Sequence, residues 1–408
     1  MKRYVIKSET IRRISLAILL TSFVIFFFSD GISKILYRSD SDFHRYSRII
    51  KAIFTFIILI YGTLTLNRTK ADILICIVLL TLSFFVGQFF LGQKLDDVDI
   101  VENSSTLFKY LFPFIYFFLV SDVLKFDEFP KIIKETYYRI LAFNNVLIIV
   151  GLITGAFFLT TYKGPWRFGY DGLIFAQNEA SFVFIFAITT VYYRRFYLGI
   201  KEWMFWIVLL PSILVATKGI FLYLIVLALF HILIRVSLVK VLGILAGLLT
   251  FVYILLNSFI NEILLNSYAV FMYMYNKGGL LFALLSGRDQ FINEKLVPLI
   301  SGYWVFPNYI FGGQEVKDYY IEMGFFDLFL FFGLFGCIIY LYVFYRIFSL
   351  IPFERKFKIF FALSLLVIIA TAGHFFESGI AGLHFLLMLL IIHFSIKQKN
   401  QEMVSKPK

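Results

Sequence analysis

Residues 284–336 read LLSGRDQFINEKLVPLISGYWVFPNYIFGGQEVKDYYIEMGFFDLFLFFGLFG. The first part is polar and aromatic, and the last part is a phenylalanine-rich run with glycines at 333 and 336. Two pieces stand out: Ser-Gly-Arg-Asp at 286–289, and Glu322 just before the apolar run. Elsewhere the chain is dominated by apolar runs of about 15 to 22 residues, the length that crosses about 30 Å of hydrocarbon. The stretch therefore ends the longest polar interruption of a predicted membrane protein.

The composition supports that class. The chain has 408 residues, of which 60% are hydrophobic and 16% charged, against roughly 25% charged residues in ordinary soluble domains. Its mean hydropathy is +0.85. Because lipid offers no partners to backbone N–H and C=O groups, each apolar run must be helical. Residues 1–408 are therefore predicted to form one all-α polytopic domain in a lipid bilayer.

Charge and cysteine content exclude several functions. The formal net charge is +12, but membrane proteins gather positive charge in cytoplasmic loops, so no nucleic-acid partner is expected. Cys76 and Cys337 both fall inside apolar runs, so neither a disulfide framework nor a metal site is predicted. There is no glycine-rich nucleotide loop, so we expect no cofactor and a substrate that arrives already activated.

About twelve runs are long enough to be predicted as spans. They lie at 14–28, 49–66, 72–91, 106–121, 140–159, 173–193, 203–216, 219–234, 237–256, 324–345, 357–372 and 380–395. Basic residues at both ends of the chain and in three loops place both termini in the cytoplasm. These residues are Lys2, Arg3, Lys7, Arg12, Arg13, Lys125, Lys131, Lys134, Arg139, Arg194, Arg195, Lys201, Arg346, Arg355, Lys356, Lys358, Lys397, Lys399, Lys406 and Lys408. The basic loop at 29–48 fits this orientation poorly.

One interruption decides the orientation of the second half. Residues 203–234 are apolar except at Thr217 and Lys218, and a single helix of that length would measure roughly 48 Å, too long for one tilted span. We predict a tight hairpin with Lys218 at the outer surface, which keeps the lysine-rich tail inside. Residues 257–322 then form one large external loop, whose apolar stretch Ile263–Tyr275 is expected to lie along the membrane surface.

Residues 286–289 have two interpretations. Ser286 as N-cap with Asp289 three residues later is a capping-box pattern at a helix start. The same helix start, with Arg288 in its first turn, would also bind a phosphate or diphosphate through N–H groups and a guanidinium. Asp289 opposes an anion there unless it orients Arg288.

Three more groups are candidates for proton transfer or its support. Glu322 ends the external loop, and its simpler interpretation is an ordinary interfacial carboxylate. Asp327 lies deeper among phenylalanines, where an ionisable group is costly and faces the protein interior or an aqueous cavity. His374 and Glu377 share one face if their short connection is helical, although they are equally suited to a polar cap.

Cations on the predicted outer side indicate an anionic ligand. Lys218, Lys163 and Arg167 are weak signals individually, but together they favour a lipid headgroup that carries phosphate.

Taken together, these segments resemble the O-antigen ligase and polymerase family of bacterial envelope glycosyltransferases. Phe168–Gly172 followed by Gln177–Ser181 is similar to the family's Gly…Asn-Glu-x-Ser segment, and Thr217-Lys218 stands where the family has Ser/Thr and a cation in an outer hairpin. Ser286-Gly287-Arg288 is similar to its Ser-Gly-Arg element.

Two later elements extend the resemblance. Glu322 with Gly333 and Gly336 falls on a pattern in which ligases carry His-Asn and end in Gly-Leu-Ile-Gly. The glutamate here is common among polysaccharide polymerases. Gly373-His374 resembles a late outer Gly-His element. The first 140 residues contribute topology alone.

The resemblance implies a GT-C-like fold and a metal-independent, inverting glycosyl transfer from an undecaprenyl-diphosphate-linked oligosaccharide. Arg288, Lys218 and Arg167 would bind the diphosphate, and Glu322 would deprotonate the acceptor, with His374 as the other catalytic candidate. The supporting residues would be Asp327, Asn178, Glu179 and Asp289.

We therefore predict a polymerase of O-antigen or capsular repeat units in the bacterial cytoplasmic membrane. A ligase with the same chemistry is the first alternative, and a flippase or exporter of lipid-linked sugars is the second. Flippase and chain-length regulator proteins are candidate partners. An exporter should carry cations deep within its spans, whereas the sequence pattern places Arg and Lys almost entirely in loops.

Overall fold

The computed structural model describes residues 2–96, 98–126, 131–164, 167–235 and 260–405. The described residues are helical apart from connections and one isolated β-bridge between Thr160 and Tyr170. Helices of the first half are α1 Lys2–Arg38, α2 Tyr46–Leu64, α3 Arg68–Leu91, α4 Ile100–Val123, α5 Lys131–Thr154 and α6 Gln177–Phe196. The second half has α7 Met204–Leu214, α8 Lys218–Arg235, α10 Ile260–Leu285, α14 Gly324–Ser349, α15 Arg355–Ala372 and α16 Gly379–Ser405. Between α10 and α14 lie the short α11 Arg288–Phe291, α12 Phe306–Phe311 and α13 Val316–Tyr319.

Among the described residues, seven helices are long and apolar enough to cross a membrane: α1, α2, α3, α4, α5, α14 and α16. A polytopic, all-helical protein is therefore confirmed, and twelve spans remain a prediction. Every predicted span coincides with a helix except 237–256, which lies outside the described residues. The predicted break at Thr217-Lys218 is confirmed, because α7 ends at Leu214 and α8 begins at Lys218.

Two predicted boundaries were wrong. The run 140–159 stops being an α-helix at Thr154, because Gly155 takes a positive φ of 66° and the chain turns into a short 3-10 helix. The first helix does not stop near residue 28 but continues to Arg38. Its extra turns carry Asp30 and Lys34, which are buried because Lys51 and Asp171 pair with them.

Buried ion pairs also correct the expectation that cations are confined to loops. Lys34 in α1 donates to Asp171 and to the Gly172 carbonyl (2.7 Å). Lys70 in α3 lies 2.6 Å from Asp122 and is fully buried. Ionisable groups buried in a membrane protein are usually paired with one another inside the protein, and the sequence pattern does not show which residue is the partner.

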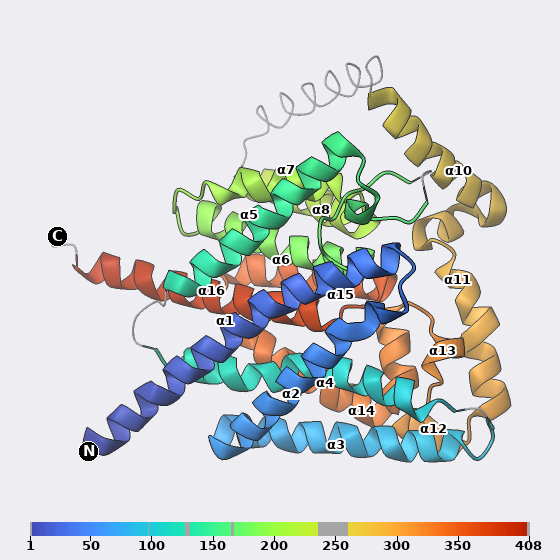
Figure 1. Cartoon of the computed structure of the whole chain (residues 1–408), viewed down its shortest axis with the longest axis horizontal. Helices are drawn as coiled ribbons and strands as arrows, with labels where there is room; N and C mark the ends of the chain where they lie inside the picture. The colour runs from blue at the N-terminus through green and yellow to red at the C-terminus, as the bar shows by residue number, and fades with distance from the viewer. Residues whose placement is uncertain (1, 97, 127–130, 165–166, 236–259, 406–408) are drawn as a thin grey trace.

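The bundle is built around α4 and α16, the most buried of the long helices. α1 and α2 pack on α4, α16 packs on α4 and α6, and α14 packs on α3 (Figure 1). Both termini lie at one end of the bundle, and α10, α11, α12 and α13 lie at the other (Figure 1). The stretch 284–322 is therefore gathered at the end opposite the termini, which is where the candidate site lies.

Candidate functional site

An ion pair joins the two pieces of the decisive stretch. Arg288 Nη2 lies 3.1 Å from Glu322 Oε2, and Arg288 Nη1 donates to the Leu285 carbonyl at 3.3 Å. Arg288 is the first residue of α11, and Glu322 lies in the turn before α14. The Arg288 side chain is 11% exposed and that of Glu322 is 38% exposed. The pair is therefore open to an incoming molecule on its carboxylate side.

Lys218 brings the α7–α8 hairpin to the same place. Its ammonium donates to Ser286 Oγ at 2.8 Å and to the Ala283 carbonyl. Burial, with the nearby charges of Arg167 and Arg288, lowers the pKa of Lys218 to about 8. Arg167 packs over the Tyr162 ring, whose hydroxyl donates to the Ala216 carbonyl. The three cations proposed for the diphosphate thus share one region.

The predicted capping box at 286–289 was wrong. The N-cap of α11 is Gly287, whose φ of 83° lies in the left-handed region, and no side chain caps the helix. Ser286 lies one residue before the N-cap, and its hydroxyl accepts a hydrogen bond from Lys218. Asp289 is half-buried, and its Oδ1 has no hydrogen-bond partner in the described part of the chain. The Arg288 side-chain bonds go to Leu285 and Glu322 rather than to Asp289.

Asp327 holds the turn that carries Glu322. Its buried carboxylate accepts the backbone N–H groups of Ile321 (2.9 Å) and Met323 (2.8 Å), one on each side of Glu322. This arrangement satisfies the N–H groups of the turn just before α14 and holds the backbone on both sides of Glu322. Asp327 therefore holds the turn that carries Glu322.

The α15–α16 connection closes the site from another side. His374 Nδ1 lies 2.8 Å from the Tyr320 hydroxyl and 2.7 Å from Glu377 Oε1. Burial lowers the pKa of His374 to about 4, so the imidazole is neutral at pH 7. Burial also raises the pKa of Glu377 to about 7, against the attraction of Lys109. Tyr320 and Lys109 were missed from the sequence, although a lone lysine inside an apolar run is itself a functional signal.

Backbone strain concentrates in these segments. Among described non-glycine residues, positive φ angles occur at Asp40, Ala216, Ser286, Glu322 and His374. All but Asp40 are site residues or lie in the turn before Lys218. Such conformations cost of order 1–3 kcal/mol each and cluster at functional sites. Gly373, at φ 60°, packs so closely that an added Cβ would lie 2.4 Å from the Glu322 carbonyl oxygen.

The first turn of α6 links the hairpin to the α15–α16 connection. Ser181 Oγ lies 2.7 Å from Thr217 Oγ1, and Ser378 donates to Glu179 at 2.8 Å. Asn178 is half-buried in the same turn. These residues therefore lie in the support of the site, where they tie together the elements that carry Lys218 and His374.

The aromatic loop at 303–311 divides into structural and exposed residues. Trp304 is buried, and its indole N–H donates to the Gly313 carbonyl at 2.8 Å, so this ring packs inside the protein. Phe306 (75% exposed) and Tyr309 (44% exposed) remain on the surface. Only exposed rings can stack on a sugar face.

No protein-family model, curated protein or solved structure matches the chain. Its function is therefore argued from the site itself.

Proposed function

We propose that this protein is a polymerase that transfers undecaprenyl-diphosphate-linked oligosaccharide repeat units to one another at the outer face of the bacterial cytoplasmic membrane. One observation carries the proposal: Arg288, Glu322, Lys218 and His374 come from four separate segments and meet at the end opposite the termini. A cationic group beside a reachable carboxylate suits the displacement of a diphosphate by a hydroxyl.

The proposed reaction is one inverting substitution. An acceptor sugar hydroxyl attacks the anomeric carbon of the donor, a C–O bond forms, and the bond to the diphosphate breaks. The hydroxyl proton goes to Glu322, and the electron pair leaves with the lipid diphosphate. Arg288 and Lys218, with Arg167 nearby, stabilise the negative charge that grows on the leaving group. A guanidinium suits this role because it can bridge two phosphate oxygens.

The Arg288–Glu322 pair suggests that donor binding precedes proton transfer to Glu322. The Arg288 guanidinium is bonded to Glu322 at 3.1 Å. A bound diphosphate would compete for that guanidinium and release the carboxylate toward the acceptor hydroxyl. Donor binding would then prepare the base, so that Glu322 becomes available as a proton acceptor once the donor is in place.

Tyr320, His374 and Glu377 occupy the neighbouring wall. Their bonds converge on His374 Nδ1, which leaves Nε2 as the ring nitrogen for a substrate. We assign His374 the second role: orientation of the acceptor or leaving group by a neutral imidazole. His374 as the base itself is the competing assignment.

Two alternative functions use the same substrate class. A ligase would pass finished polymer to another acceptor with the same groups. An exporter is favoured by Lys34, Lys51 and Lys109, which lie within long apolar helices. However, Lys34 and Lys51 are each paired with a carboxylate, Asp171 and Asp30, so both cations are engaged inside the protein.

The experiment that separates these functions is deletion of the gene followed by analysis of lipid-linked sugars on each side of the membrane. Single repeats at the outer face would support the polymerase. Long lipid-linked polymer would indicate a ligase, and single repeats retained inside would indicate an exporter.

The proposed orientation has its own test. In a chain with Cys76 and Cys337 replaced by serine, Ser301→Cys should react with an impermeant thiol reagent in intact cells. Arg355→Cys, an exposed position at the other end, should be protected until the cells are opened. The reverse pattern would place the site in the cytoplasm and reject the proposal.

A further inference from the structure

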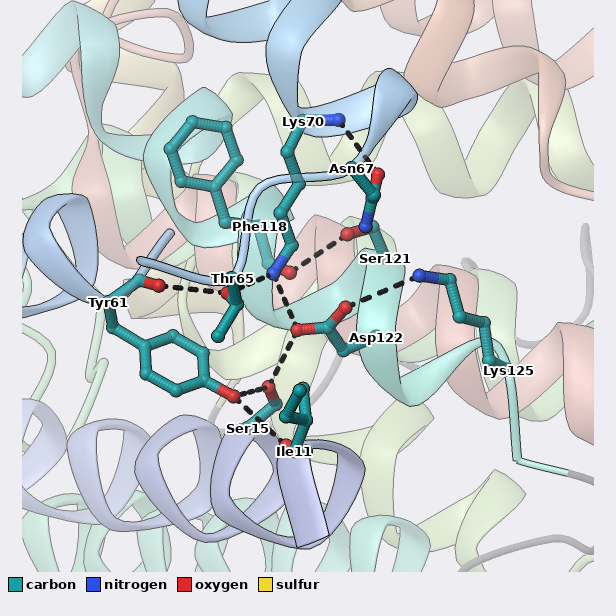
Figure 2. A network of polar contacts seen from close by, with 10 residues as sticks. All are labelled: Ile11, Ser15, Tyr61, Thr65, Asn67, Lys70, Phe118, Ser121, Asp122 and Lys125. Atoms are coloured by element: carbon teal, nitrogen blue, oxygen red, sulfur yellow. Dashed lines mark hydrogen bonds and ion pairs between the residues drawn. The ribbon is translucent and has the colours of Figure 1, made fainter. Parts of the chain in front are cut away.

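Lys109 differs from three other lysines of the long apolar helices. Lys34, Lys51 and Lys70 each donate a hydrogen bond to a buried carboxylate. Figure 2 shows the most complete case, in which Lys70 bonds to Asp122 at 2.6 Å within a network of neighbouring side chains. Lys109 lies in the apolar helix α4 and, within the described residues, forms neither a hydrogen bond nor a close ion pair. Its ammonium therefore lacks the kind of partner that the other three have.

The position of Lys109 makes this absence costly. α4 is one of the two most buried long helices, and Lys109 lies partly buried about two and a half turns from its start. An ionisable group in a membrane helix faces the protein interior or an aqueous cavity. A polar group without a hydrogen-bond partner in the protein marks a place where another molecule supplies one. Lys109 therefore retains its N–H donors for a ligand.

The neighbours of Lys109 are mostly acidic. Its electrostatic interaction is strongest with Glu377, and it also interacts with Arg48, Glu102 and Glu179. Arg48 and Glu102 pair with each other at 3.1 Å and are 43% and 29% exposed. They lie at the end of the bundle that carries the candidate site, because the first turn of α4 is bonded to α13 there. Water therefore reaches the edge of this group of residues from the same end as the candidate site.

Two of these carboxylates retain acceptor capacity. Glu377 Oε1 lies 2.7 Å from His374 Nδ1, and Glu179 Oε1 accepts a hydrogen bond from Ser378 at 2.8 Å. The Oε2 atom of each carboxylate has no hydrogen bond in the described part of the chain, and both residues are partly exposed. Lys109, Glu179 and Glu377, here called the Lys109 cluster, therefore combine donors and acceptors that the protein does not saturate.

The charges of the Lys109 cluster decide the class of its ligand. Glu179 and Glu377 set two carboxylates against one ammonium, so the cluster disfavours a phosphate, unlike the cationic region of Arg288 and Lys218. The ammonium disfavours a metal ion in the same way. A hydroxyl group suits both charges, because its O–H donates to a carboxylate while its oxygen accepts from an ammonium. The cluster therefore favours a neutral molecule with several hydroxyl groups.

We propose that the Lys109 cluster binds hydroxyl groups of the acceptor sugar. The inference rests on the glycosyl transfer proposed above and assigns a site to one of its two substrates. His374 connects the two regions, since it lies 2.7 Å from Glu377 and interacts electrostatically with Glu322 and Arg288. A sugar bound at the cluster lies beside the proposed base Glu322, and the diphosphate of the donor lies at the cations.

Binding of a soluble oligosaccharide tests the proposal without requiring transfer. The probe is a single repeat unit, prepared by partial acid hydrolysis of the surface polysaccharide of the same cells and titrated into the purified full-length protein by calorimetry. Lys109→Met should weaken oligosaccharide binding about 10- to 100-fold, because a hydrogen bond from a charged donor is lost. The melting temperature should stay close to that of the wild type, because Lys109 has no hydrogen bond within the described residues.

Glu179→Gln is the second variant, which keeps the shape of the side chain and should weaken oligosaccharide binding about fivefold. It keeps the test decisive if Lys109→Met fails to fold. The matched control is Lys94→Met, which changes an exposed lysine between α3 and α4 at the same end and should bind as the wild type does. Unchanged affinity in folded Lys109→Met and in Glu179→Gln would overturn the proposal, and so would an equal loss in the control.

Undecaprenyl diphosphate, which carries no sugar, is the second ligand and separates this inference from the proposed function. Lys109→Met should bind this lipid as tightly as the wild type, because Arg288 and Lys218 are unchanged. Weaker binding of the lipid with normal binding of the oligosaccharide would overturn the sugar assignment in favour of a phosphate. A wild type that binds the oligosaccharide through Lys109 but does not bind the lipid would reject the diphosphate-linked donor and support the sugar site alone.

Discussion

Two ion pairs at opposite ends of the bundle differ in how completely they are satisfied. Lys70–Asp122 is buried, with exposed fractions of 0% and 4%, and is surrounded by Thr65 and Ser15 as additional partners. Arg288–Glu322 is exposed on its carboxylate side. The Arg288 Nε is buried and lacks a partner within the described residues. The polar groups of the Lys70–Asp122 pair are satisfied within the protein, whereas the Arg288–Glu322 pair retains hydrogen-bonding capacity for a ligand.

The backbone under the two pairs differs as well. Lys70 and Asp122 lie within the regular helices α3 and α4. Glu322 has a φ of 63°, and Ser286 and His374 have similar values. A protein holds residues in such conformations only where the surrounding structure determines them. At the termini end the ion pair is fully satisfied within regular helices, whereas at the other end it is only partly satisfied and lies on strained backbone, as the proposed function requires.

The largest expected effect is the loss of polymer synthesis when the Arg288–Glu322 pair is broken. Arg288→Ala should abolish polymer in cells, because the leaving diphosphate loses its bidentate partner. Its cost in unfolding free energy should be about 1–3 kcal/mol, because Arg288 is largely buried and also bonds to the Leu285 carbonyl, whereas Glu322 stays open to water. Arg288→Lys should recover part of the polymer. Polymer yield and membrane level would be measured together.

Lys317→Ala is the matched control, since Lys317 is an exposed cation of the same loop and should leave polymer unchanged. Normal polymer in Arg288→Ala would mean that Arg288 only stabilises the start of α11, and the contrast between the two ends would disappear.

The buried pair should behave in the opposite way. Lys70→Met removes the buried partner of Asp122 and leaves the half-exposed Lys125, 3.5 Å away, as its neighbouring cation. Breaking a buried pair in this way costs about 3–5 kcal/mol. The double variant Lys70→Met/Asp122→Leu should recover most of that loss, because burying two apolar groups is often neutral relative to an ion pair. Thermal unfolding in detergent provides the measurement. A stability loss below that of Arg288→Ala would contradict the assignment of structural and functional ends.

Much of this fold was predictable because hydropathy dictates helices in lipid. The break before Lys218 follows from length alone. The extension of α1 to Arg38 was not predictable, because it depends on partners of Asp30 and Lys34 that lie far away in sequence. The sequence shows where the charged residues are, but it does not show which distant residue neutralises each of them.

The site was predictable to a smaller extent. Motif order singled out Arg288, Lys218, Glu322 and His374, and the structure brings them to one end. The capping-box prediction was wrong because α11 begins after Gly287, which takes a left-handed conformation as the N-cap, and the Ser286 hydroxyl accepts from Lys218 across the fold. The contact of Tyr320 with His374 has no local signal, since 54 residues separate the two.

A smaller effect on the transfer rate is expected at Asp327, which holds the turn that carries Glu322. Asp327→Asn keeps the size of the side chain but has one acceptor oxygen in place of two. One of the hydrogen bonds from Ile321 and Met323 is therefore lost, and the turn that carries Glu322 should loosen. The loss of one hydrogen bond, about 1 kcal/mol, corresponds to a decrease of roughly five- to tenfold in transfer rate if it falls on the transition state. Asp318→Asn, exposed in α13, is the control and should transfer normally. A larger effect on stability than on rate would make Asp327 purely structural.

The smallest effect concerns pH. Burial raises the pKa of Glu377 to about 7, with His374, Lys109 and Glu179 facing it. A carboxyl whose folded pKa is raised binds its proton more tightly in the folded state, so its contribution to stability falls as pH rises from its ordinary value through 7. Glu377→Gln should therefore gain melting temperature relative to the wild type between about pH 5 and pH 8. A difference independent of pH would show that Glu377 does not titrate in this range.

The most direct test of the central claim is the transfer rate of Glu322→Gln, measured with purified protein and a defined lipid-linked donor alongside donor affinity. Glutamine is nearly isosteric but not basic, so turnover should fall by about 10²–10⁴-fold, the usual contribution of general-base catalysis. Donor affinity should survive, because Arg288 and Lys218 are untouched. Near-normal turnover in Glu322→Gln together with collapse in His374→Ala would assign the base to His374 and contradict the account.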